Sequence, residues 1–588
     1  MQIRTYAQRI LMRPLTTETT AKVKAGRSVR RSDVTSTGGA LIRRCLYSGL
    51  VTRGNEETSN DGQLGDAHCL PTLIAKPAQF PKSELRVKRL IKTAVLAMAL
   101  VSGHTYASQE RPHYHFTPIR GWINDPNGLL KKDGIYHLFY QYYDGGWALA
   151  DGQFKDPMVW GPMHWGHATS RDLVHWRSQP VALSPDKRIS NTAVEGMIFS
   201  GSAVFDSKNT SGLGTSQHPP IVAVYTLADT FGAGSGQRQA LAYSLDNGAI
   251  WKKYRGNPVI PYNNTETFRD PQVFWFGGDS KWAMVISCGD RVCFYNSPNL
   301  KQWSKVGEFG KDESGTGVPW ECPDLFPLVV THNGKTEIKW VLIVSVQHGA
   351  PSGSFGTRYF VGDFDGKTFR NLAAASDFKW LDYGSDDYAG RTWQTTTVDL
   401  THRTMIGWMA NWTYAKTLPT TKYRGSMTIP RDITLQYDES GYYLAQKPAG
   451  AVSALLRGQT TAVLLNEAHP VTVVGTSVPR LIKADISLSP NSGRFELVIF
   501  ERDGQQFSIH YDARTSEVSV DRRSYAGYAF DTDKAPQIAR TTPVKHHLRI
   551  QVLLDVDSAE VFVNDGKQTF TNLLFSPATK PISNTLAH

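Results

Sequence analysis

Cysteine is scarce in this sequence, and the positions of the few cysteines exclude the common zinc sites. The chain of 588 residues has five cysteines, and none of them forms a Cys-x-x-Cys pair or stands in a Cys/His cluster. We therefore expect no bound metal. Cys288 and Cys293 are close enough in sequence to bridge two strands of one hairpin, but buried, apolar thiols are the favoured interpretation.

Excess charge is absent from most of the chain. The formal net charge is +11, but residues 1–108 carry 17 Lys and Arg against 7 Asp and Glu, which leaves the rest of the chain close to neutral. A protein that binds nucleic acid or an anionic membrane carries its basic residues on the folded domain. We therefore expect neither nucleic acid nor a membrane among its partners.

Long hydrophobic runs are also lacking. The apolar run at residues 93–101 is too short to span a membrane as a stable helix. It follows the basic segment 86–92 and precedes the small-residue stretch 105–107, which is the order of regions in a secretory signal peptide. Residues 1–108 are thus interpreted as a leader that ends in a signal peptide at about residues 87–107, which predicts a secreted or periplasmic protein.

A signal peptide so far from Met1 is unusual. A translation start at Val87, from a non-AUG codon, would place the signal at the N-terminus of the product. The alternative is a genuine leader, either disordered or used for targeting.

Long amphipathic helices are missing from residues 109–445, where short strand patterns are bounded by Gly, Pro, Asn and Asp. A turn with Asp or Asn precedes an aromatic residue four times, at residues 172–176, 246–251, 299–303 and 365–369. Recurring sheet-and-turn units of this size suggest the blades of a β-propeller. Alternating strand patterns at residues 450–588 predict a second, antiparallel sandwich.

Three short acidic motifs follow one another through the strand-rich region. Asp125 lies in the stretch WINDPNG, Asp270 lies between Arg269 and Pro271, and Glu321 lies in the stretch WECPD. Each motif alone has a structural explanation, namely a hairpin turn, an ion pair and a solvated turn. Their combination and order favour a functional role.

These motifs, with FSGSA at 199–203, YFVGDFDG at 359–366, DYG at 382–384 and GWMANW at 407–412, resemble the motifs of the glycoside hydrolase family 32 β-fructosidases. That family includes invertases, exo-inulinases and levanases, and the resemblance covers about residues 110–588. It implies an all-β chain, with a five-bladed β-propeller at residues 109–445 followed by a C-terminal β-sandwich at residues 450–588. The three acidic motifs are then expected at the central funnel of the propeller.

The resemblance assigns a catalytic role to each of the three carboxyl groups. Asp125 is expected to be the nucleophile, and Glu321 the acid/base, because a retaining glycosidase needs both about 5–5.5 Å apart. The apolar or weakly polar neighbours of Glu321 would favour its protonated form, as a general acid requires. Asp270 is expected to stabilise the transition state by holding two sugar hydroxyls, with Arg269 helping to keep it ionised.

The same resemblance predicts further residues at the sugar site. They are Asn124, Gln141, Trp160, Phe199, Ser200, Arg269 and Trp412. Four histidines that could be mistaken for metal ligands, His113, His115, His164 and His167, are interpreted as structural, since the family needs no metal and no cofactor. The loop at residues 145–159 is longer than is usual in the family, so we expect it to border the funnel mouth.

The resemblance implies a retaining, exo-acting hydrolase that releases terminal β-D-fructose from inulin, levan and sucrose by double displacement. Two alternatives stay open. A fructosyltransferase would use the same carboxylates but pass the fructosyl unit to a sugar instead of water. A fructan-binding protein without catalysis belongs to another class, and the presence of all three carboxylates argues against it.

Overall fold

The computed structural model describes residues 111–575, except 148–154, 191–192, 230–235, 263–266, 312–317, 375–376, 378, 398, 456–459, 466–470, 473–479, 489–492, 503–504 and 523–535. The leader and the signal peptide expected at residues 1–108 therefore lie outside the described residues. Among the residues that the structure does describe, no helix has the length and apolar character that a membrane crossing requires.

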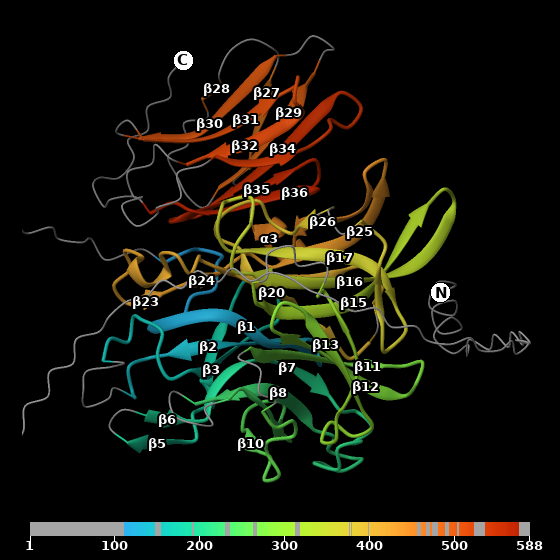
Figure 1. The fold of residues 1–588 in the computed structure, drawn as a ribbon. Coiled ribbons are helices and arrows are strands. Elements are labelled where there is room, and N and C mark those ends of the chain that lie inside the picture. Colours follow the sequence, from blue (N-terminus) through green and yellow to red (C-terminus); the bar gives the residue numbers. More distant parts are fainter. Residues whose placement is uncertain are drawn as a thin grey trace, which may run out of the picture. The chain divides into compact units, whose positions relative to one another are not determined.

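Five blade-like sheets follow one another along the first part of the chain (Figure 1). The first contains β1 (Gly121–Lys132), β2 (Ile135–Tyr143), β3 (His164–Ser170) and β4 (Arg177–Leu183), with β21 (Gln394–Thr395) and β23 (Tyr423–Arg424) paired to β1. The second contains β7 (Met197–Phe205), β8 (Ile221–Ala228), β9 (Arg238–Ser244) and β10 (Lys252–Lys253). The third contains β11 (Phe268–Phe276), β12 (Lys281–Cys288), β13 (Val292–Ser297) and β14 (Ser304–Phe309).

The fourth and fifth sheets continue the same arrangement. The fourth contains β15 (Trp320–His332), β16 (Lys335–Val346), β17 (Gly356–Phe364) and β18 (Phe369–Asn371), with β19 (Lys379–Trp380) paired to β17. The fifth contains β20 (Tyr388–Thr392), β22 (Arg403–Met409), β25 (Arg431–Asp438) and β26 (Gly441–Pro448), with β24 (Ser426–Met427) paired to β22. A separate hairpin joins β5 (Lys187–Ser190) to β6 (Ala193–Glu195), and the turn η1 (Ala415–Thr417) follows β22.

The innermost strands of the five sheets form a ring. Strand β1 contacts β7, β7 contacts β11, β11 contacts β15, β15 contacts β20, and β20 returns to β1. Strands β21 and β23, which come from the end of this region, pair in parallel with β1 and so join the last part of the region to the first. The predicted five-bladed β-propeller is confirmed by this architecture.

The repeated turns that suggested blades connect the third and fourth strands of successive sheets. Between β3 and β4, the Ser170 hydroxyl and the Asp172 carboxylate bond to each other, and the Trp176 indole N–H donates to the carbonyl of Leu173 at 3.1 Å. The indoles of Trp251 and Trp303 make the same bond at 3.1 Å and 2.7 Å in the next two blades. The same sequence pattern thus forms the same turn between the third and fourth strands of three successive blades.

Each innermost strand is interrupted at the same point. The pairing with the second strand of the blade shifts between residues 123 and 126, 198 and 201, 269 and 272, 321 and 324, and 388 and 391. Asp270, Cys322 and Ala389, which lie inside three of these bulges, have positive φ angles of 66°, 49° and 56°. A β-bulge changes the direction of the side chains beside it. Because the five bulges lie at equivalent points of the ring, the side chains that they redirect face the same region.

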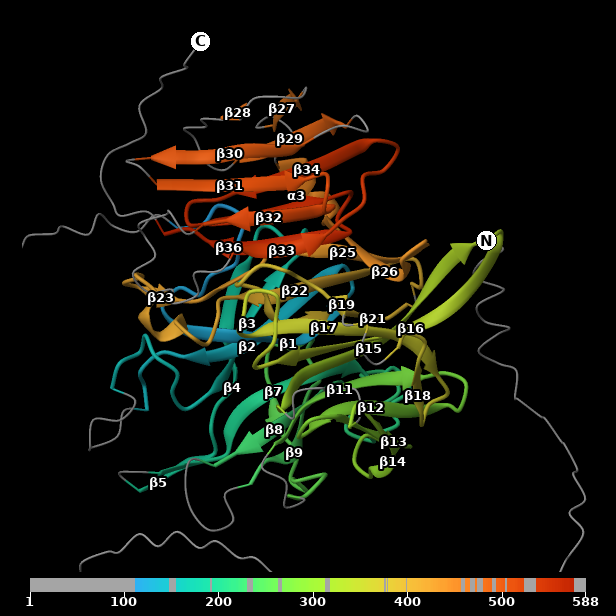
Figure 2. The same cartoon turned by 45° about the horizontal axis from the view of Figure 1, so that its top comes forward.

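Two five-stranded sheets form the C-terminal part (Figure 2). One contains β27 (Thr460–Leu465), β29 (Arg480–Ser487), β34 (His547–Leu554), β35 (Ser558–Val563) and β36 (Gln568–Leu573). The other contains β28 (Val471–Thr472), β30 (Arg494–Arg502), β31 (Gln505–Asp512), β32 (Glu517–Asp521) and β33 (Gln537–Arg540). Alternate residues of both sheets, such as Ile509, Val518 and Val552, pack into one buried core, so this part is the predicted β-sandwich. The helix α3 (Gly450–Leu455) precedes it.

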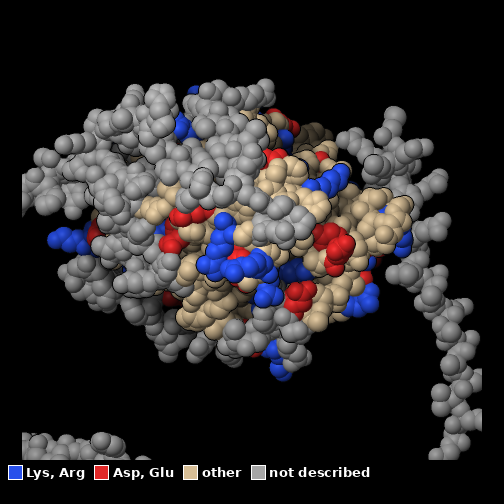
Figure 3. Space-filling model, turned by 90° about the horizontal axis from the view of Figure 1, so that it is seen from above, with Lys and Arg blue, Asp and Glu red and all other residues tan. Residues whose placement is uncertain are grey.

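Charged side chains of both signs lie beside one another over the described part of the face in Figure 3. This mixture agrees with the near-neutral composition of the chain after residue 108.

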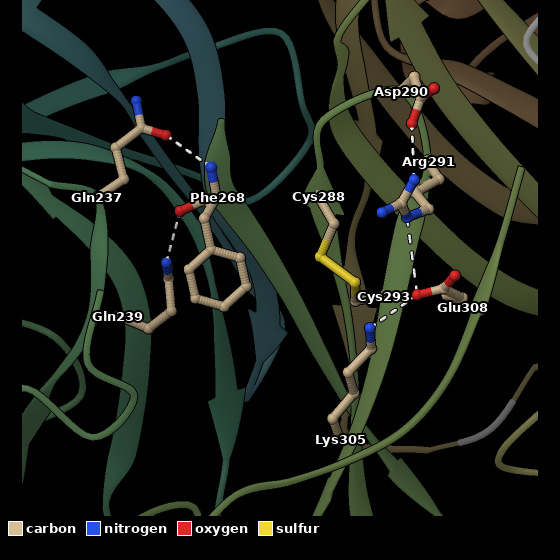
Figure 4. The surroundings of a disulfide bond; sticks show 9 residues. All are labelled: Gln237, Gln239, Phe268, Cys288, Asp290, Arg291, Cys293, Lys305 and Glu308. Atoms are coloured by element: carbon tan, nitrogen blue, oxygen red, sulfur yellow. Dashed lines mark hydrogen bonds and ion pairs between the residues drawn. A yellow bond between two sulfur atoms is a disulfide. The ribbon is translucent and has the colours of Figure 1, made fainter. Parts of the chain in front are cut away.

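The prediction of two buried thiols at Cys288 and Cys293 is wrong, because the two residues form a disulfide (Figure 4). Strands β12 and β13 form a hairpin in which Cys293 stands opposite Ile286. Cys288 lies two residues beyond Ile286, so the two cysteines are diagonal neighbours on one face of the hairpin. Only Cys322 is a free, buried thiol among the cysteines that the structure describes.

A buried charge network joins the sandwich to the propeller. His115 lies between Asp555 and Glu560, with ring nitrogens 2.7 Å and 2.9 Å from their carboxylates. Burial alone would lower the pKa of His115, but the hydrogen bonds to the two carboxylates raise it to about 9. The imidazolium therefore stabilises the fold at neutral pH.

We expect this contribution to disappear at alkaline pH. Because the folded pKa lies above the ordinary value, the stabilisation is complete below about pH 6.5 and is lost as the pH rises through about 9. The melting temperature of the wild type should exceed that of a His115→Gln variant most at about pH 6, and the difference should shrink towards pH 9. A difference that stays constant or grows with pH would contradict this assignment.

Candidate active site

Asp125 lies in the bulge of β1 and is held by two neighbours. The hydroxyl of Ser200, from the bulge of β7, donates to Asp125 Oδ2 at 2.6 Å. The amide of Asn124 donates to Oδ1 at 3.1 Å, and its own oxygen accepts a bond from the indole of Trp122. Two donors that face a half-buried carboxylate fix its orientation.

Asp270 lies in the bulge of β11 and is buried. Its Oδ2 atom accepts a bond from the backbone N–H of Cys322 at 3.0 Å, and its own backbone N–H donates to the hydroxyl of Thr226. Burial raises the pKa of Asp270 to about 6; the Arg269 and Arg391 charges oppose that rise, whereas Asp125 and Glu321 add to it. The residue is thus ionised near neutral pH and protonated in acid.

Glu321 immediately precedes the bulge of β15 and has two donors of its own. Arg269 Nη2 donates to Oε1 at 2.6 Å, and the hydroxyl of Tyr388 donates to Oε2. Burial and the neighbouring carboxylate hold the pKa of Tyr388 well above its ordinary value, so this phenol stays protonated and donates. The sequence neighbours of Glu321 suggested an apolar setting, but the residues that meet its carboxyl group come from other blades and are polar.

Arg269 contacts both Glu321 and Asp270. Arg269 lies 2.6 Å from Glu321 but 3.8 Å from Asp270, between Arg269 Nε and Asp270 Oδ2. Arg269 still lowers the pKa of Asp270 through its charge, but its direct bond goes to Glu321.

The thiol of Cys322 connects two of the carboxylates. Its sulfur lies 3.3 Å from Asp125 Oδ2 and 3.7 Å from Asp270 Oδ2. Burial and the surrounding carboxylates hold the pKa of this thiol well above its ordinary value, so it stays protonated. It can therefore donate a weak hydrogen bond to either acid. Sequence analysis identified Cys322 only as a neighbour of Glu321.

The other predicted site residues lie around the same point. Gln141 is buried on β2, and its amide donates to the carbonyl of Ile198 at the bulge of β7. The half-buried rings of Trp160 and Phe199 meet edge to face, with centroids 5.9 Å apart. Trp412 packs against Trp122 and Trp408. These aromatic residues border the cluster that contains Trp122, Cys322 and Tyr388.

Two residues at this site were not predicted as site residues from the sequence. Trp147, at the start of the loop 145–159, packs against the cluster that includes Trp160 and Phe199, so the described start of this loop does border the site. Tyr388 immediately precedes the bulge of β20, the position that Glu321 occupies before its own bulge. This equivalence of position could have identified Tyr388 as a site residue. It becomes visible only when the pairing register of the inner strands is known.

Asp324 and histidines of the propeller and its N-terminal segment bond to neighbouring strands and loops. Asp324, one strand position beyond the bulge of β15, accepts bonds from the backbone N–H and hydroxyl of Thr392. His164 lies 2.8 Å from the carbonyl of Pro162, and His167 lies 3.1 Å from His137. His113 lies 3.2 Å from Asp555. Within the described ranges, no three His, Cys, Asp or Glu side chains are grouped so as to hold a metal.

A cavity of about 310 Å³ lies at the other ends of the inner strands. Phe205, Trp275, Phe326 and Trp340 contribute to its mainly apolar wall, together with Arg403. None of the three carboxylates lines it. The three carboxyl groups of the candidate site therefore lie at the bulges and not in this cavity.

Two carboxyl groups in one site are the groups that double displacement at a sugar requires, and this site holds three. Comparison with known families agrees with this chemistry. The model of the glycosyl hydrolases family 32 N-terminal domain matches residues 115–448, and that of the family 32 C-terminal domain matches residues 452–586. The chain belongs to glycosyl hydrolase family 32.

Individual family members resemble the chain over most of its length. The levanase of Bacillus subtilis (strain 168) is 41% identical over 505 residues, which are 83% of this chain and 71% of the levanase. The extracellular exo-inulinase inuE of Aspergillus ficuum is 36% identical over 529 residues, covering 83% of this chain and 94% of that enzyme. The crystal structure of the exo-inulinase of Aspergillus awamori superposes with a TM-score of 0.69 at 33% identity, covering 80% of this chain and 94% of that one.

Proposed function

We propose that this family 32 enzyme is a retaining exo-β-fructosidase, which releases terminal β-D-fructose from inulin, levan and sucrose. The observation that carries the proposal is the convergence of Asp125, Asp270 and Glu321 at the bulges of three inner strands of the ring, where the Cys322 thiol contacts both aspartates and Arg269 contacts Glu321. The likeness to a levanase and to exo-inulinases supports the choice of substrate class.

In the first step, the carboxylate of Asp125 attacks the anomeric carbon, C2, of the terminal fructosyl unit and forms an ester bond. The glycosidic bond breaks as Glu321 donates its proton to the leaving oxygen. In the second step, Glu321 takes a proton from water, and the water oxygen attacks C2. The ester bond breaks, fructose leaves with its configuration retained, and Asp125 is again a carboxylate.

Asp270 stabilises the positive charge that develops on the fructosyl ring and accepts hydrogen bonds from ring hydroxyls. Its burial strengthens these interactions, because the local dielectric is low. Arg269 and Tyr388 fix the carboxyl group of Glu321 at the glycosidic oxygen. The rings of Trp160, Phe199 and Trp412 supply an apolar wall beside the sugar.

The decisive experiment compares sugar release from levan, inulin and sucrose by the protein from residue 108 onward, beside an Asp125→Ala control. Fructose as the single product from both polymers, abolished in the control, supports an exo-fructanase. Sucrose cleavage with inert polymers narrows the activity to an invertase. Oligosaccharide products that grow at high sucrose concentration indicate a fructosyltransferase, and binding without release indicates the non-catalytic alternative.

The same proposal includes secretion and the division of the chain. We place the propeller domain at residues 109–445, the sandwich domain at 450–588, and the cleavage of a signal peptide close to Ala107. The extracellular exo-inulinase relatives support secretion. N-terminal sequencing of the protein recovered from the medium tests it, because a mature start well before Ala107 would contradict the signal peptide.

A Tyr388→Phe variant should lower kcat for levan about tenfold, because Glu321 loses one of the two bonds that fix its carboxyl group. The loss should be smaller for an aryl fructoside, whose leaving group departs without help from an acid. Steady-state kinetics on both substrates measures the difference. Equal losses on the two substrates would show that Tyr388 does not act through Glu321.

A further inference from the structure

Arg391 is a buried cation beneath the site that the proposed mechanism does not use. It follows the bulge of β20 and is 1% exposed. On the inner strand of the fourth blade, Asp324 occupies the same position after the bulge, and on the third blade Gln272 does. The three residues thus belong to a layer of polar side chains next to the layer of the catalytic carboxylates.

The guanidinium of Arg391 reaches across the ring to the backbone around Asp270. Nη2 donates to the carbonyl of Asp270 at 3.1 Å, and Nη1 donates to the side-chain oxygen of Gln272 at 3.1 Å. Nη1 also makes longer contacts, at 3.5 Å, with the carbonyls of Gly201 and Pro271. One side chain of the fifth blade therefore holds the bulge of the third blade at its acid and at the two residues that follow.

Burying a guanidinium is expensive unless polar or charged groups compensate for lost hydration. No ion pair between described residues includes Arg391, and its Nε atom has no hydrogen-bond partner there. Its charge acts on two buried carboxyl groups, Asp270 and Asp324, and lowers the pKa of each. An apolar residue would fill this position at less cost, so the charge itself needs an explanation.

We infer that Arg391 is a positioning residue for Asp270, which fixes the left-handed backbone of the bulge and, together with Arg269, supplies positive charge that favours the ionised carboxylate. The inference rests on the proposed role of Asp270 as transition-state stabiliser. The geometry separates it from Arg269, which binds Glu321 directly and stands 3.8 Å from Asp270.

Several groups contribute to the charge state of Asp270. The titratable or charged side chains that face it among the described residues are Asp125 from β1, Arg269 from β11, Glu321 and Cys322 from β15, and Arg391 from β20. Burial raises the pKa of Asp270 to about 6, and the nearby carboxylates add to this rise. The two arginines oppose it, so removing Arg391 leaves Arg269 as the counter-charge within this set.

The first test is the pH dependence of kcat/KM for levan in Arg391→Met and Arg391→Lys variants. For Arg391→Met, the acidic limb should move to higher pH by on the order of one unit, because Asp270 becomes harder to ionise. The plateau value of kcat/KM should also fall, by roughly tenfold to a hundredfold, since the bulge loses the hydrogen bonds that Arg391 donates to it. Arg391→Lys keeps the positive charge but loses the paired N–H donors of the guanidinium. The acidic limb of its pH profile should therefore stay near the wild-type position, whereas the plateau of kcat/KM should fall.

Arg403→Met is the matched control. Arg403, on β22, bonds to the hydroxyl of Thr392 and acts on Asp324, but it does not act on Asp270. This variant should keep the wild-type pH profile even if it is less stable. An acidic limb that stays in place in Arg391→Met, or that moves equally in Arg403→Met, overturns the inference.

A second test does not depend on activity. Asp270 has a folded pKa above its ordinary value, so it destabilises the fold increasingly as the pH rises from about 4 to about 6. Without Arg391 this loss should continue to higher pH, and the melting temperature of Arg391→Met should fall further below that of the wild type between pH 6 and pH 8. In an Asp270→Asn background the part of this change that runs through Asp270 disappears, and only the part due to Asp324 remains.

The two tests separate failure of the inference from failure of the proposed function. A wild type that releases no fructose refutes the function, but the melting temperatures still report whether Arg391 acts on Asp270. A difference in melting temperature that grows with pH by the same amount in both backgrounds shows that Arg391 serves packing or Asp324 alone. In that case the inference is wrong whatever the activity.

Discussion

An Asp125→Asn variant should lose at least about 10⁴-fold in kcat on levan while it folds normally. The amide is close in size to the carboxylate and can still accept the Ser200 hydroxyl bond, so the site keeps its shape. It cannot form the ester bond to the sugar, and removal of a nucleophile from a double displacement costs factors of this order. Fructose release measured over long incubations, together with the melting temperature, gives the result.

A matched control lies on the same hairpin. Asp133 is exposed in the turn between β1 and β2 and has a positive φ of 50°, which Asn accepts. Asp133→Asn should therefore retain full activity. If Asp125→Asn kept more than about 1% of wild-type kcat, Asp125 would not be the nucleophile. A fructosyl group found by mass spectrometry on a peptide other than that of Asp125, in a slow Glu321→Gln variant, would have the same consequence.

Sequence alone identified the features that depend on short stretches of chain. The strand patterns, the turns that begin at Asp172, Asp246 and Asn299, and the three acidic motifs each lie within a few residues. Asp125, Asp270 and Glu321 were therefore assigned from the motifs, and the structure places them on three inner strands of one ring, β1, β11 and β15. Their catalytic roles stay predictions.

Contacts between blades were less accessible to sequence analysis. Arg269 was expected to act on Asp270, its neighbour, and its charge does lower the pKa of that residue, but its hydrogen bond to Glu321, which lies 52 residues further along the chain, was not predicted. Tyr388 and Arg391 were missed for the same reason. Their partners lie on other blades, and no local pattern encodes the register that brings them together.

The contact between propeller and sandwich was equally hidden. Arg431 on β25 is fully buried and pairs with Asp382, Asp387 and Glu560, the last of which belongs to β35 of the sandwich. In the sequence these residues are isolated charges in strands and turns. Their pairing depends on the docking of the two domains, which no spacing along the chain predicts.

An Arg431→Met variant should lower the free energy of unfolding by about 3–5 kcal/mol, because three buried carboxylates lose their shared counter-charge. Urea denaturation monitored by tryptophan fluorescence measures the shift of the midpoint. The matched control is Arg494→Met, which removes an exposed pair with Asp512 in the sandwich and should shift the midpoint much less. Equal shifts for the two variants would mean that the Arg431 network is not a source of stability.

The same substitution should also reduce activity, because the network continues into the site. The backbone N–H groups of Tyr383 and Asp386 donate to carbonyls of β36 in the sandwich, and Asp387 lies directly before Tyr388, which donates to Glu321. When Arg431 is absent, Asp387 loses its partner and the segment that places Tyr388 loses one support. The activity of folded Arg431→Met should therefore fall towards that of Tyr388→Phe and show the same preference for an aryl fructoside. Full activity in a destabilised Arg431→Met variant would instead show that β36 alone holds this segment.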